Sequence, residues 1–282
     1  MDTLHFERYE YKYFFPEERA DAIRRFIRPY AALDRHASGS GDGRYTIRNI
    51  YLDTPKLDLF RACVNDEVDR FKLRIRWYGE EPKGPFFFEV KRKLRQVILK
   101  DRAKISAADV RALLRGEPLS LPAGPTRDHL MAFLDRVVSH GMVPCLFSRY
   151  TREPYESVFG DYARLTFDRA MCFQPAQGRG EDPRAWTYTD APWATGGVRQ
   201  AGVLELKFTR EYPRWMADLV AEFELERIGY SKYVSAVQHR LDTAHGGRDF
   251  DRRATVWGAS TRIPVRPDPI PAEPAVLKKM EV

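Results

Sequence analysis

The feature that most constrains the fold is the stretch from Arg70 to Tyr78, in which cationic and apolar side chains alternate. Every second position from Arg70 to Arg76 is Arg or Lys, and the positions between them are Phe, Leu and Ile, followed by Trp77. Because successive side chains of a β-strand point to opposite faces, the stretch predicts a strand with one cationic and one apolar face. An isolated strand of this kind can keep its charges in water. Recurrence of the pattern elsewhere in the chain argues against that simple interpretation.

Similar patterns, several with a charged face, predict further strands. They cover residues 6–15, 45–53, 86–93, 98–102, 145–155, 162–173 and 203–209. A set of strands that each turn apolar side chains one way and cations the other buries both faces by closing around a polar interior. The sequence therefore predicts a β tunnel lined with Lys and Arg, which needs a polyanion to fill it.

Amphipathic segments predict helices that pack outside the strands. They follow Pro16, cover residues 107–115, run from Thr126 to Gly141, begin at Pro213 and cover residues 231–241. Residues 38–43 are predicted as a flexible linker and residues 174–199 as a long surface excursion. The predicted fold class is α+β, with a tunnel domain over residues 1–241 and a polar, proline-rich tail over residues 242–282.

The charge balance indicates a partner class without identifying the partner. The net charge of +7 favours an anion, whether nucleic acid, a membrane surface or phosphate. Cys63, Cys145 and Cys172 are odd in number and widely spaced, which argues against a disulfide framework and against a Cys-x-x-Cys metal site. The sequence shows no N-terminal signal and no long apolar run, so the expected location is cytoplasmic, with membrane association only through a partner.

The usual catalytic signatures are absent from the sequence, which has no Walker A loop, no His-Glu-x-x-His and no Gly-x-Ser-x-Gly. What remains is a set of cations accompanied by few carboxylates, at Glu10, Glu89, Asp168 and Glu205. Phosphate groups offset crowded cations through charge-assisted hydrogen bonds. A few carboxylates can hold Mg²⁺ or Mn²⁺ beside phosphate oxygens. The pattern indicates binding of a phosphate chain and phosphoryl transfer.

Several motifs resemble one known family. They are Arg8-x-Glu10-x-Lys12-Tyr13, the run from Ile47 to Thr54, the run from Lys72 to Tyr78, Phe88-Glu89-Val90-Lys91, Leu204-Glu205-Leu206-Lys207-Phe208 and Ser231-Lys232-Tyr233. In this order they resemble the VTC domain, the polyphosphate-polymerase branch of the CYTH, or triphosphate tunnel metalloenzyme, superfamily. The resemblance extends over about residues 6–241.

The resemblance implies an eight-stranded antiparallel tunnel that transfers the terminal phosphoryl group of ATP to a growing polyphosphate chain. It also implies Mn²⁺ or Mg²⁺ as cofactor, ATP and polyphosphate as partners, and a membrane-protein partner for export or storage of the polymer. A nucleic-acid partner is not expected, because the aromatic side chains fall mostly on the strand faces opposite the cations.

Carried over by position, the resemblance implies three sets of site residues. The catalytic cations are Lys12, Arg74, Arg76, Lys91 and Lys207. The phosphate-binding residues are Arg8, Arg48, Lys72, Lys100, Arg152, Arg164 and Lys232. The metal ligands are Glu205, Glu10 and Glu89. Lys104 competes with Lys100, and three residues fit either the tunnel or its rim: Lys72, Lys93 and Arg102.

Two departures from the superfamily favour transfer over hydrolysis. Hydrolases there often begin Glu-x-Glu-x-Lys, whereas this chain has Arg8 at the first position and Val203 two residues before Glu205. The carboxylate pairs that would hold a metal and an attacking water are thus reduced to single carboxylates. The alternatives are a tunnel triphosphatase and a non-catalytic module that binds polyphosphate or inositol phosphates, and Glu205 argues against the second.

Overall fold

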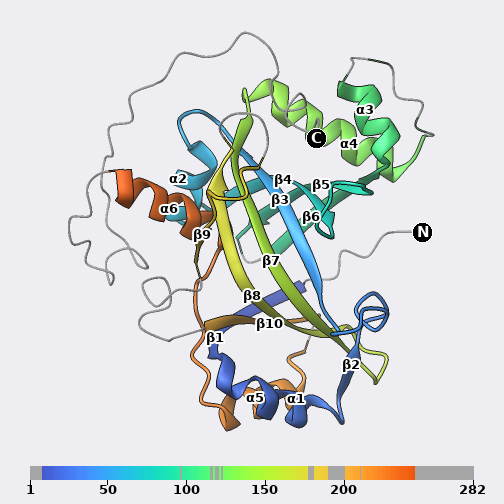
Figure 1. The fold of residues 1–282 in the computed structure, drawn as a ribbon, viewed down its shortest axis with the longest axis vertical. Coiled ribbons are helices and arrows are strands. Elements are labelled where there is room, and N and C mark those ends of the chain that lie inside the picture. Colours follow the sequence, from blue (N-terminus) through green and yellow to red (C-terminus); the bar gives the residue numbers. More distant parts are fainter. Residues whose placement is uncertain are drawn as a thin grey trace. The chain divides into compact units, whose positions relative to one another are not determined.

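Figure 1 shows the fold in the computed structural model, which describes residues 8–95, 97–114, 117, 121, 123–176, 181–189, 201–209 and 211–244. The strands are β1 (Arg8–Pro16), β2 (Ala31–Leu33), β3 (Tyr45–Asp53), β4 (Asp69–Tyr78), β5 (Phe86–Leu94), β6 (Val97–Ile105), β7 (Val143–Ser157), β8 (Ala163–Pro175), β9 (Thr187–Tyr188) and β10 (Ala201–Thr209). The α-helices are α1 (Ala20–Ile27), α2 (Asp58–Val64), α3 (Ala107–Leu114), α4 (Pro125–Ser139), α5 (Arg214–Glu222) and α6 (Lys232–Ala244). A 3₁₀ turn, η1 (Glu17–Arg19), precedes α1.

The strands form one sheet in the order β1-β10-β8-β7-β3-β4-β5-β6, with β2 beside β7 and β9 beside β8. The pairs β1–β10, β10–β8, β4–β5 and β5–β6 are antiparallel. The predicted α+β class, with an antiparallel sheet and packing helices, is confirmed. The predicted closure is not, because the order of the described strands ends at β1 and at β6 and gives an open sheet.

The chain forms two compact units. The first unit consists of the described parts of residues 1–47, 149–172 and 188–230, and the second of those of residues 48–148, 173–187 and 231–282. Strands β3, β7 and β8 contribute residues to both units. Helix α6 continues past the predicted domain boundary at residue 241, and the rest of the predicted tail lies outside the described residues.

Strand alternation places the core on one face of each strand. In the second unit Leu73 and Ile75 of β4 and Phe88 of β5 are buried, and α4 packs its Phe133 against them. In the first unit α1 packs against α5 and buries the apolar stripe predicted for it, which includes Ile23. Burial of such apolar side chains stabilises by roughly 1.5–3 kcal/mol each. The opposite faces of the same strands are thereby left to the charged residues.

Three short elements were not predicted: β2, α2 and β9. Residues 174–199 were predicted as a surface excursion, but β8 continues to Pro175 and β9 pairs with β8. Residues 177–180 and 190–200 of that segment lie outside the described residues. No helix in the described part of the chain is long and apolar enough to span a membrane.

Candidate phosphate-binding site

In the second unit, cations form rows across β4, β5 and β6. Residues that lie directly opposite one another in antiparallel pairs point to the same face of the sheet. One row consists of Lys72, Lys91 and Lys100 and contains no carboxylate. Like charges placed directly opposite one another destabilise a sheet. Binding of an anion would remove this cost, so the row favours an anionic ligand.

Two further rows continue this face. They are Arg74, Glu89 and Arg102, then Arg76, Phe87 and Lys104. We refer to the three rows together as the cationic face. Of the two lysines that compete for one site position, Lys100 lies 2.7 Å from Glu89 and Lys104 lies opposite Phe87. Contact with the central carboxylate therefore favours Lys100, and Arg102, predicted for either tunnel or rim, belongs to the face.

Glu89 is the one carboxylate of these described rows and is fully buried. Its Oε2 accepts a hydrogen bond of 2.6 Å from Arg74 Nε, while its Oε1 lies 2.7 Å from Lys100 Nζ and 2.9 Å from Arg102 Nε. Burial acts to raise the pKa of Glu89, but the charges of the surrounding Arg and Lys side chains lower it well below its ordinary value. Glu89 is therefore anionic, and it balances only part of the positive charge around it.

Two phenols show that a positive potential remains. The hydroxyl of Tyr51 accepts a hydrogen bond of 3.4 Å from Arg74, and that of Tyr78 accepts one of 3.0 Å from Arg102. Burial acts to raise the pKa of each phenol, yet nearby Arg charges, including that of Arg76, lower both below the ordinary value. The same potential would stabilise phosphate oxygens.

Neutral side chains help to orient this face. Arg76 is buried, and its Nε donates a 2.8 Å hydrogen bond to Asn49 Oδ1, while Asn49 Nδ2 donates to Ser148 Oγ at 3.1 Å. These contacts fix a guanidinium without themselves neutralising it. Immediately before α6, Ser231 Oγ accepts a 3.0 Å hydrogen bond from Lys72 Nζ, and the charge of Lys232, the first residue of α6, is among those that lower the Tyr51 pKa.

Arg48 differs from the other predicted phosphate-binding residues of this unit. Its guanidinium lies 2.6 Å from Glu80 and also contacts Glu181, and the residue is buried. Two carboxylates therefore more than neutralise the positive charge of Arg48. Its role in phosphate binding stays a prediction.

In the first unit, charges of opposite sign alternate instead. Across β1 and β10, Glu10 lies opposite Lys207 and Lys12 lies opposite Glu205. Lys207 Nζ donates to Glu205 Oε2 at 2.8 Å, and Lys12 Nζ lies 3.0 Å from Glu10 and 3.6 Å from Glu205. Lys12 Nζ also donates to the Tyr230 carbonyl at 3.0 Å. These four charged residues, with Arg152 and Asp168, are called the mixed-charge cluster below.

Arg152 and Asp168 complete this cluster. Both oxygens of the fully buried Asp168 accept 2.7 Å hydrogen bonds from Arg152, and Arg152 Nη2 also donates to Glu205 at 3.1 Å. Burial acts to lower the pKa of Arg152, but its carboxylate neighbours raise it well above the ordinary value. Burial acts to raise the pKa of Glu205, while the charges of Lys207, Lys12 and Arg152 lower it well below the ordinary value.

The sequence predicts single carboxylates in each strand motif, and the structure brings two of these single carboxylates near one another. Glu10 and Glu205 come from different strands and share Lys12, whose Nζ lies 3.0 Å from Glu10 and 3.6 Å from Glu205. Arg8 lies opposite Thr209 in the strand register, and its side chain is outside what the structure describes. Arg164 is half-exposed and pairs with Glu156 at 2.8 Å, a rim position rather than a buried one.

The predicted metal ligands do not form one group. Among the described residues, no group of three or more His, Cys, Asp or Glu side chains is placed to hold a metal ion. Glu10 and Glu205 still fit Mg²⁺ or Mn²⁺, since such ions in phosphoryl-transfer sites are held by one or two carboxylates plus phosphate oxygens and water. Lys12 already occupies a cationic position between the two carboxylates. Glu89 fits less well, because its oxygens meet three cations and the described rows around it contain no second carboxylate.

Sequence reasoning missed the neutral and aromatic neighbours of the cationic face, namely Asn49, Tyr51, Tyr78 and Ser148. Phe87 was predicted on this face, because it alternates in phase with Glu89 and Lys91, and Arg102 lies 3.9 Å above its ring. Asn49 and Ser148 carry no such signal, since their contact joins strands ninety-nine residues apart in the sequence.

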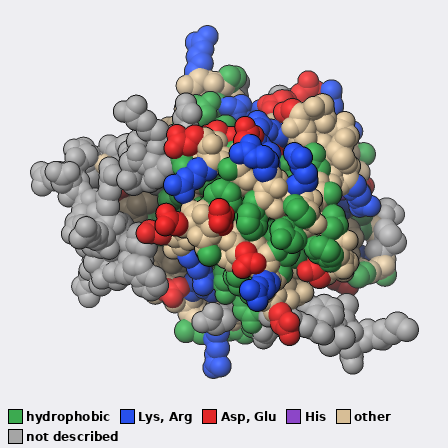
Figure 2. All heavy atoms as spheres, turned by 90° about the horizontal axis from the view of Figure 1, so that it is seen from below, with side chains coloured by type: hydrophobic (Ala, Val, Ile, Leu, Met, Phe, Trp, Pro, Cys, Tyr) green, Lys and Arg blue, Asp and Glu red, His purple; other side chains and the backbone are tan. Residues whose placement is uncertain are grey.

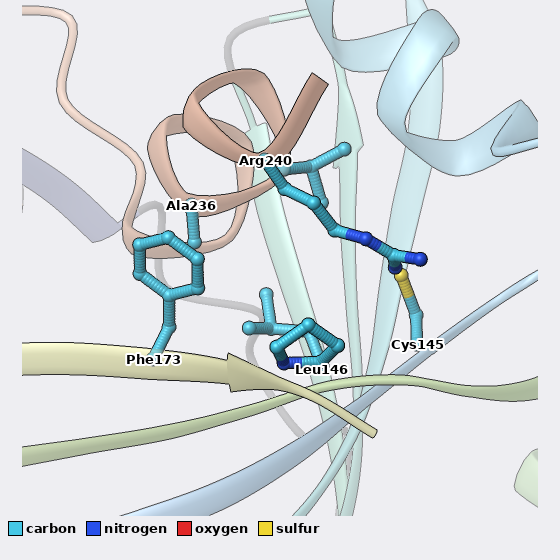
Figure 3. Close-up of a pocket in the computed structure, with 7 residues that line it drawn as sticks. Cys145, Leu146, Phe173, Ala236 and Arg240 are labelled. Atoms are coloured by element: carbon cyan, nitrogen blue, oxygen red, sulfur yellow. The ribbon is translucent and has the colours of Figure 1, made fainter. Parts of the chain in front are cut away.

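Neither the cavity beside α6 nor the face drawn in Figure 2 offers an alternative phosphate-binding site. A cavity of about 10 Å³ lies in the second unit beside α6, lined mainly by apolar side chains such as Leu146 and Phe173 (Figure 3). That volume holds at most one water molecule. The face in Figure 2 intermixes basic and acidic side chains around hydrophobic ones, so it carries no large region of one charge sign.

The fold and the two clusters define an antiparallel β-sheet protein with a cationic face and a mixed-charge cluster. The family model of the VTC domain matches residues 7–240, and the chain belongs to this family. Vacuolar transporter chaperone complex subunit 2 of Schizosaccharomyces pombe is 24% identical over 226 residues, which cover 67% of this chain and 30% of that relative. The chain therefore spans under a third of the length of that protein.

Two solved structures are similar at low identity. The PH1819 protein from Pyrococcus horikoshii OT3 is 13% identical with a TM-score of 0.42, over 83% of this chain and 99% of that one. HpAC1 from Hippeastrum, an adenylyl cyclase candidate described as having a dominant triphosphatase activity, is 15% identical with a TM-score of 0.44, over 83% of this chain and 96% of that one.

Proposed function

We propose that this protein is a polyphosphate polymerase that transfers the terminal phosphoryl group of ATP to a growing phosphate chain. The observation that carries the proposal is the row of Lys72, Lys91 and Lys100, three lysines directly opposite one another in the strand register, where the single carboxylate of the neighbouring row, Glu89, contacts Lys100 at 2.7 Å. Such a row is costly in the free protein and favourable beneath a repeating anion. Membership of the VTC domain family supports the same substrate class.

The reaction is a displacement at phosphorus. A terminal oxygen of the acceptor chain attacks the γ-phosphorus of ATP, the bond from that phosphorus to the β–γ bridging oxygen breaks, and ADP leaves with the electron pair. The three lysines hold phosphate oxygens as point charges, and Arg74 and Arg102 donate directed hydrogen bonds to oxygens that gain charge. A fixed cationic face lowers the barrier mainly by positioning and charge stabilisation.

Glu10 and Glu205 would hold the divalent metal. When bound there, Mn²⁺ or Mg²⁺ would neutralise charge on phosphate oxygens that reach the mixed-charge cluster. Lys12 lies beside both carboxylates and Lys207 lies beside Glu205. Burial acts to raise the pKa of Glu205, but Lys207 and its other cationic neighbours lower it well below its ordinary value, which favours the ionised carboxylate that a metal needs. We further propose ATP as the donor and a complex with a membrane protein, for which the name of the Schizosaccharomyces pombe relative gives support.

A second candidate function is a tunnel triphosphatase. One observation favours it, namely that Glu10 and Glu205 lie together although the sequence places them in separate motifs. Two adjacent carboxylates can hold a metal and orient a water molecule. The loss of the usual glutamate positions at Arg8 and Val203 therefore weighs less against hydrolysis than the sequence alone implies.

One experiment separates the two functions. Purified protein is incubated with ATP and Mn²⁺, and the products are resolved by gel electrophoresis for polyphosphate and by a colorimetric assay for orthophosphate. We expect ADP and a polymer, with no polymer from Lys91→Gln, which interrupts the lysine row. Release of orthophosphate alone by the wild-type protein would overturn the polymerase assignment in favour of the triphosphatase. Release of neither product, with tight binding of tripolyphosphate, would instead indicate a binding module.

A further inference from the structure

Asp53 connects three elements of the second unit. It lies fully buried at the end of β3 and accepts backbone hydrogen bonds from Thr54, Leu59 and Phe60 at 2.7, 2.9 and 3.0 Å. Its Oδ2 also accepts a hydrogen bond from the hydroxyl of Tyr233 in α6. Because Leu59 and Phe60 belong to the first turn of α2, one carboxylate joins β3, α2 and α6.

Tyr233 also reaches the cationic face through its ring. The ring stacks on that of Tyr51, with centroids 5.1 Å apart and planes at 29°, and the Tyr51 hydroxyl accepts the hydrogen bond from Arg74. The two residues immediately before Tyr233 are Ser231, which binds Lys72, and Lys232, whose charge acts on Tyr51. The start of α6 therefore adjoins the cationic face at several points.

The apolar contacts of α6 determine how closely the helix packs, but they constrain its rotation about its own axis only weakly. Its underside is apolar, with Ala236 and Val237 against Phe173 and Leu146, beside the small cavity seen in Figure 3. Apolar burial is non-directional, whereas a hydrogen bond has a preferred distance and angle. The bond from Tyr233 to Asp53 is thus the contact best suited to set how α6 is turned about its axis.

We propose that Asp53 and Tyr233 are positioning residues that hold the first turn of α6 so that Lys232 and Ser231 stay on the cationic face. The inference deepens the proposed function and rests on it for its consequence in substrate binding. Asp53 already stabilises the start of α2 through two backbone hydrogen bonds, and this role alone would give the pair a purely structural purpose. Tyr233→Phe separates the two roles, because it removes only the hydroxyl and leaves the backbone bonds of Asp53 in place.

The first measurement needs no phosphate ligand. The ring-carbon signal of Tyr51, assigned with Tyr51→Phe, is followed against pH by NMR in protein labelled with ¹³C-tyrosine. Lys232→Ala should raise the pKa of Tyr51, since it removes a cation that lowers it. Tyr233→Phe should raise that pKa too, and it should add little in the Lys232→Ala background. An unchanged Tyr51 pKa in either single variant would overturn the proposal.

The second measurement is the affinity of the full chain for tripolyphosphate by calorimetry. Tyr233→Phe should weaken binding about tenfold, as expected for one misplaced charge-assisted contact. In the Lys232→Ala background the same substitution should have little effect, because coupled residues give non-additive changes. Equal losses in both backgrounds would mean that Tyr233 does not act through Lys232 and would overturn the inference.

Val237→Ala is the matched control. It loosens the apolar underside of α6 without touching the hydroxyl, so it should lower the melting temperature and leave both the Tyr51 pKa and the tripolyphosphate affinity unchanged. If Val237→Ala and Tyr233→Phe had equal effects on the Tyr51 pKa and on affinity, Asp53 and Tyr233 would only stabilise the helix, and the positioning role would be wrong. If Tyr233→Phe does not fold, Asp53→Asn tests the same bond. If the wild-type protein does not bind tripolyphosphate, the proposed function fails while the NMR result still decides the positioning role.

Discussion

The cationic face and the mixed-charge cluster are built from the same kind of strand but differ in what lies opposite each charge. In the first unit Lys12 and Lys207 each meet a carboxylate across β1 and β10. In the second unit Lys91 meets a lysine on each side. A strand's own alternation therefore determines which side chains share a face, but the neighbouring strands determine whether their charges are neutralised.

The pKa shifts express the same difference. In the mixed-charge cluster, burial acts against Arg152 and Glu205, yet their opposite charges keep both ionised over a wider pH range. In the second unit, partial burial and the charges of three arginines lower the pKa of Lys100 well below its ordinary value, although Glu89 opposes them and the side chain stays 34% exposed. A lysine stabilised by one carboxylate and destabilised by several cations indicates a region that is electrostatically incomplete without an anion.

The largest expected effect is that of Glu205→Gln on turnover. The amide keeps the shape of the side chain but removes the charge that would hold a divalent metal. Activity should fall about a thousandfold, as for loss of a major electrostatic contribution to the transition state. Tripolyphosphate binding should persist, because Glu205 is not among the residues of the cationic face. The measurement is a metal titration of the rate, with calorimetry for the binding.

Glu89→Gln is the matched variant in the cationic face. It removes a carboxylate that contacts three cations, so it should destabilise the ligand-free fold and make stability more dependent on added tripolyphosphate. If Glu205→Gln leaves the metal dependence of the rate unchanged while Glu89→Gln alters it, the assignment of metal binding to the mixed-charge cluster is wrong.

The next prediction concerns stability and the carboxylate of Glu153, which follows Arg152 in β7 and therefore points to the opposite face of that strand. Glu153 accepts hydrogen bonds from Arg24, Arg169 and Tyr155 at 2.7–2.9 Å. Burial acts to raise its pKa, but Arg24 and its other partners lower it to about 2. Because the folded-state pKa is lowered, the stabilisation is present above the unfolded pKa and is lost as pH falls towards 2. Its size is about 3 kcal/mol at neutral pH.

Glu153→Gln tests this by chemical unfolding across pH. The variant should be less stable than the wild type by about 3 kcal/mol at pH 7, and the difference should vanish near pH 2, where both side chains are neutral. A difference that stays constant from pH 7 to pH 2 would show that the loss comes from packing and not from charge. Turnover at pH 7 should change little, because Glu153 lies on the core side of its strand.

Local patterns predicted the strands and their charged faces, including β3 over Tyr45–Asp53 and the parity of β4. They did not predict contacts between distant strands, such as Glu10 with Glu205, because these depend on pairing of opposite ends of the chain. Helix α2 was missed for a related reason. It is short, follows Leu57 in a left-handed conformation, and is stabilised by a carboxylate from the end of β3.

The smallest expected effect is a change in the free energy of unfolding on replacing one lysine. It tests the difference between the cationic face and the mixed-charge cluster most directly, because its sign should be opposite in the two. Lys91→Gln removes one of three opposed ammonium groups, so it should raise the ligand-free free energy of unfolding by about 0.5 kcal/mol. Lys207→Gln removes the partner of a buried carboxylate 2.8 Å away, so it should lower that free energy by about 1 kcal/mol or more. Urea unfolding at low salt measures both.

Added tripolyphosphate should invert the order of Lys91→Gln and the wild type. A ligand stabilises the native state by an amount that grows with the logarithm of its concentration divided by the dissociation constant. The wild type, with the complete lysine row, should bind tripolyphosphate more tightly and gain more. High salt should reduce the gain from Lys91→Gln in the free protein, because screening weakens repulsion between partly exposed ammonium groups. If Lys91→Gln instead destabilises the free protein as Lys207→Gln does, Lys91 is neutralised within the fold. The cationic face would then have no greater need of an anion than the mixed-charge cluster.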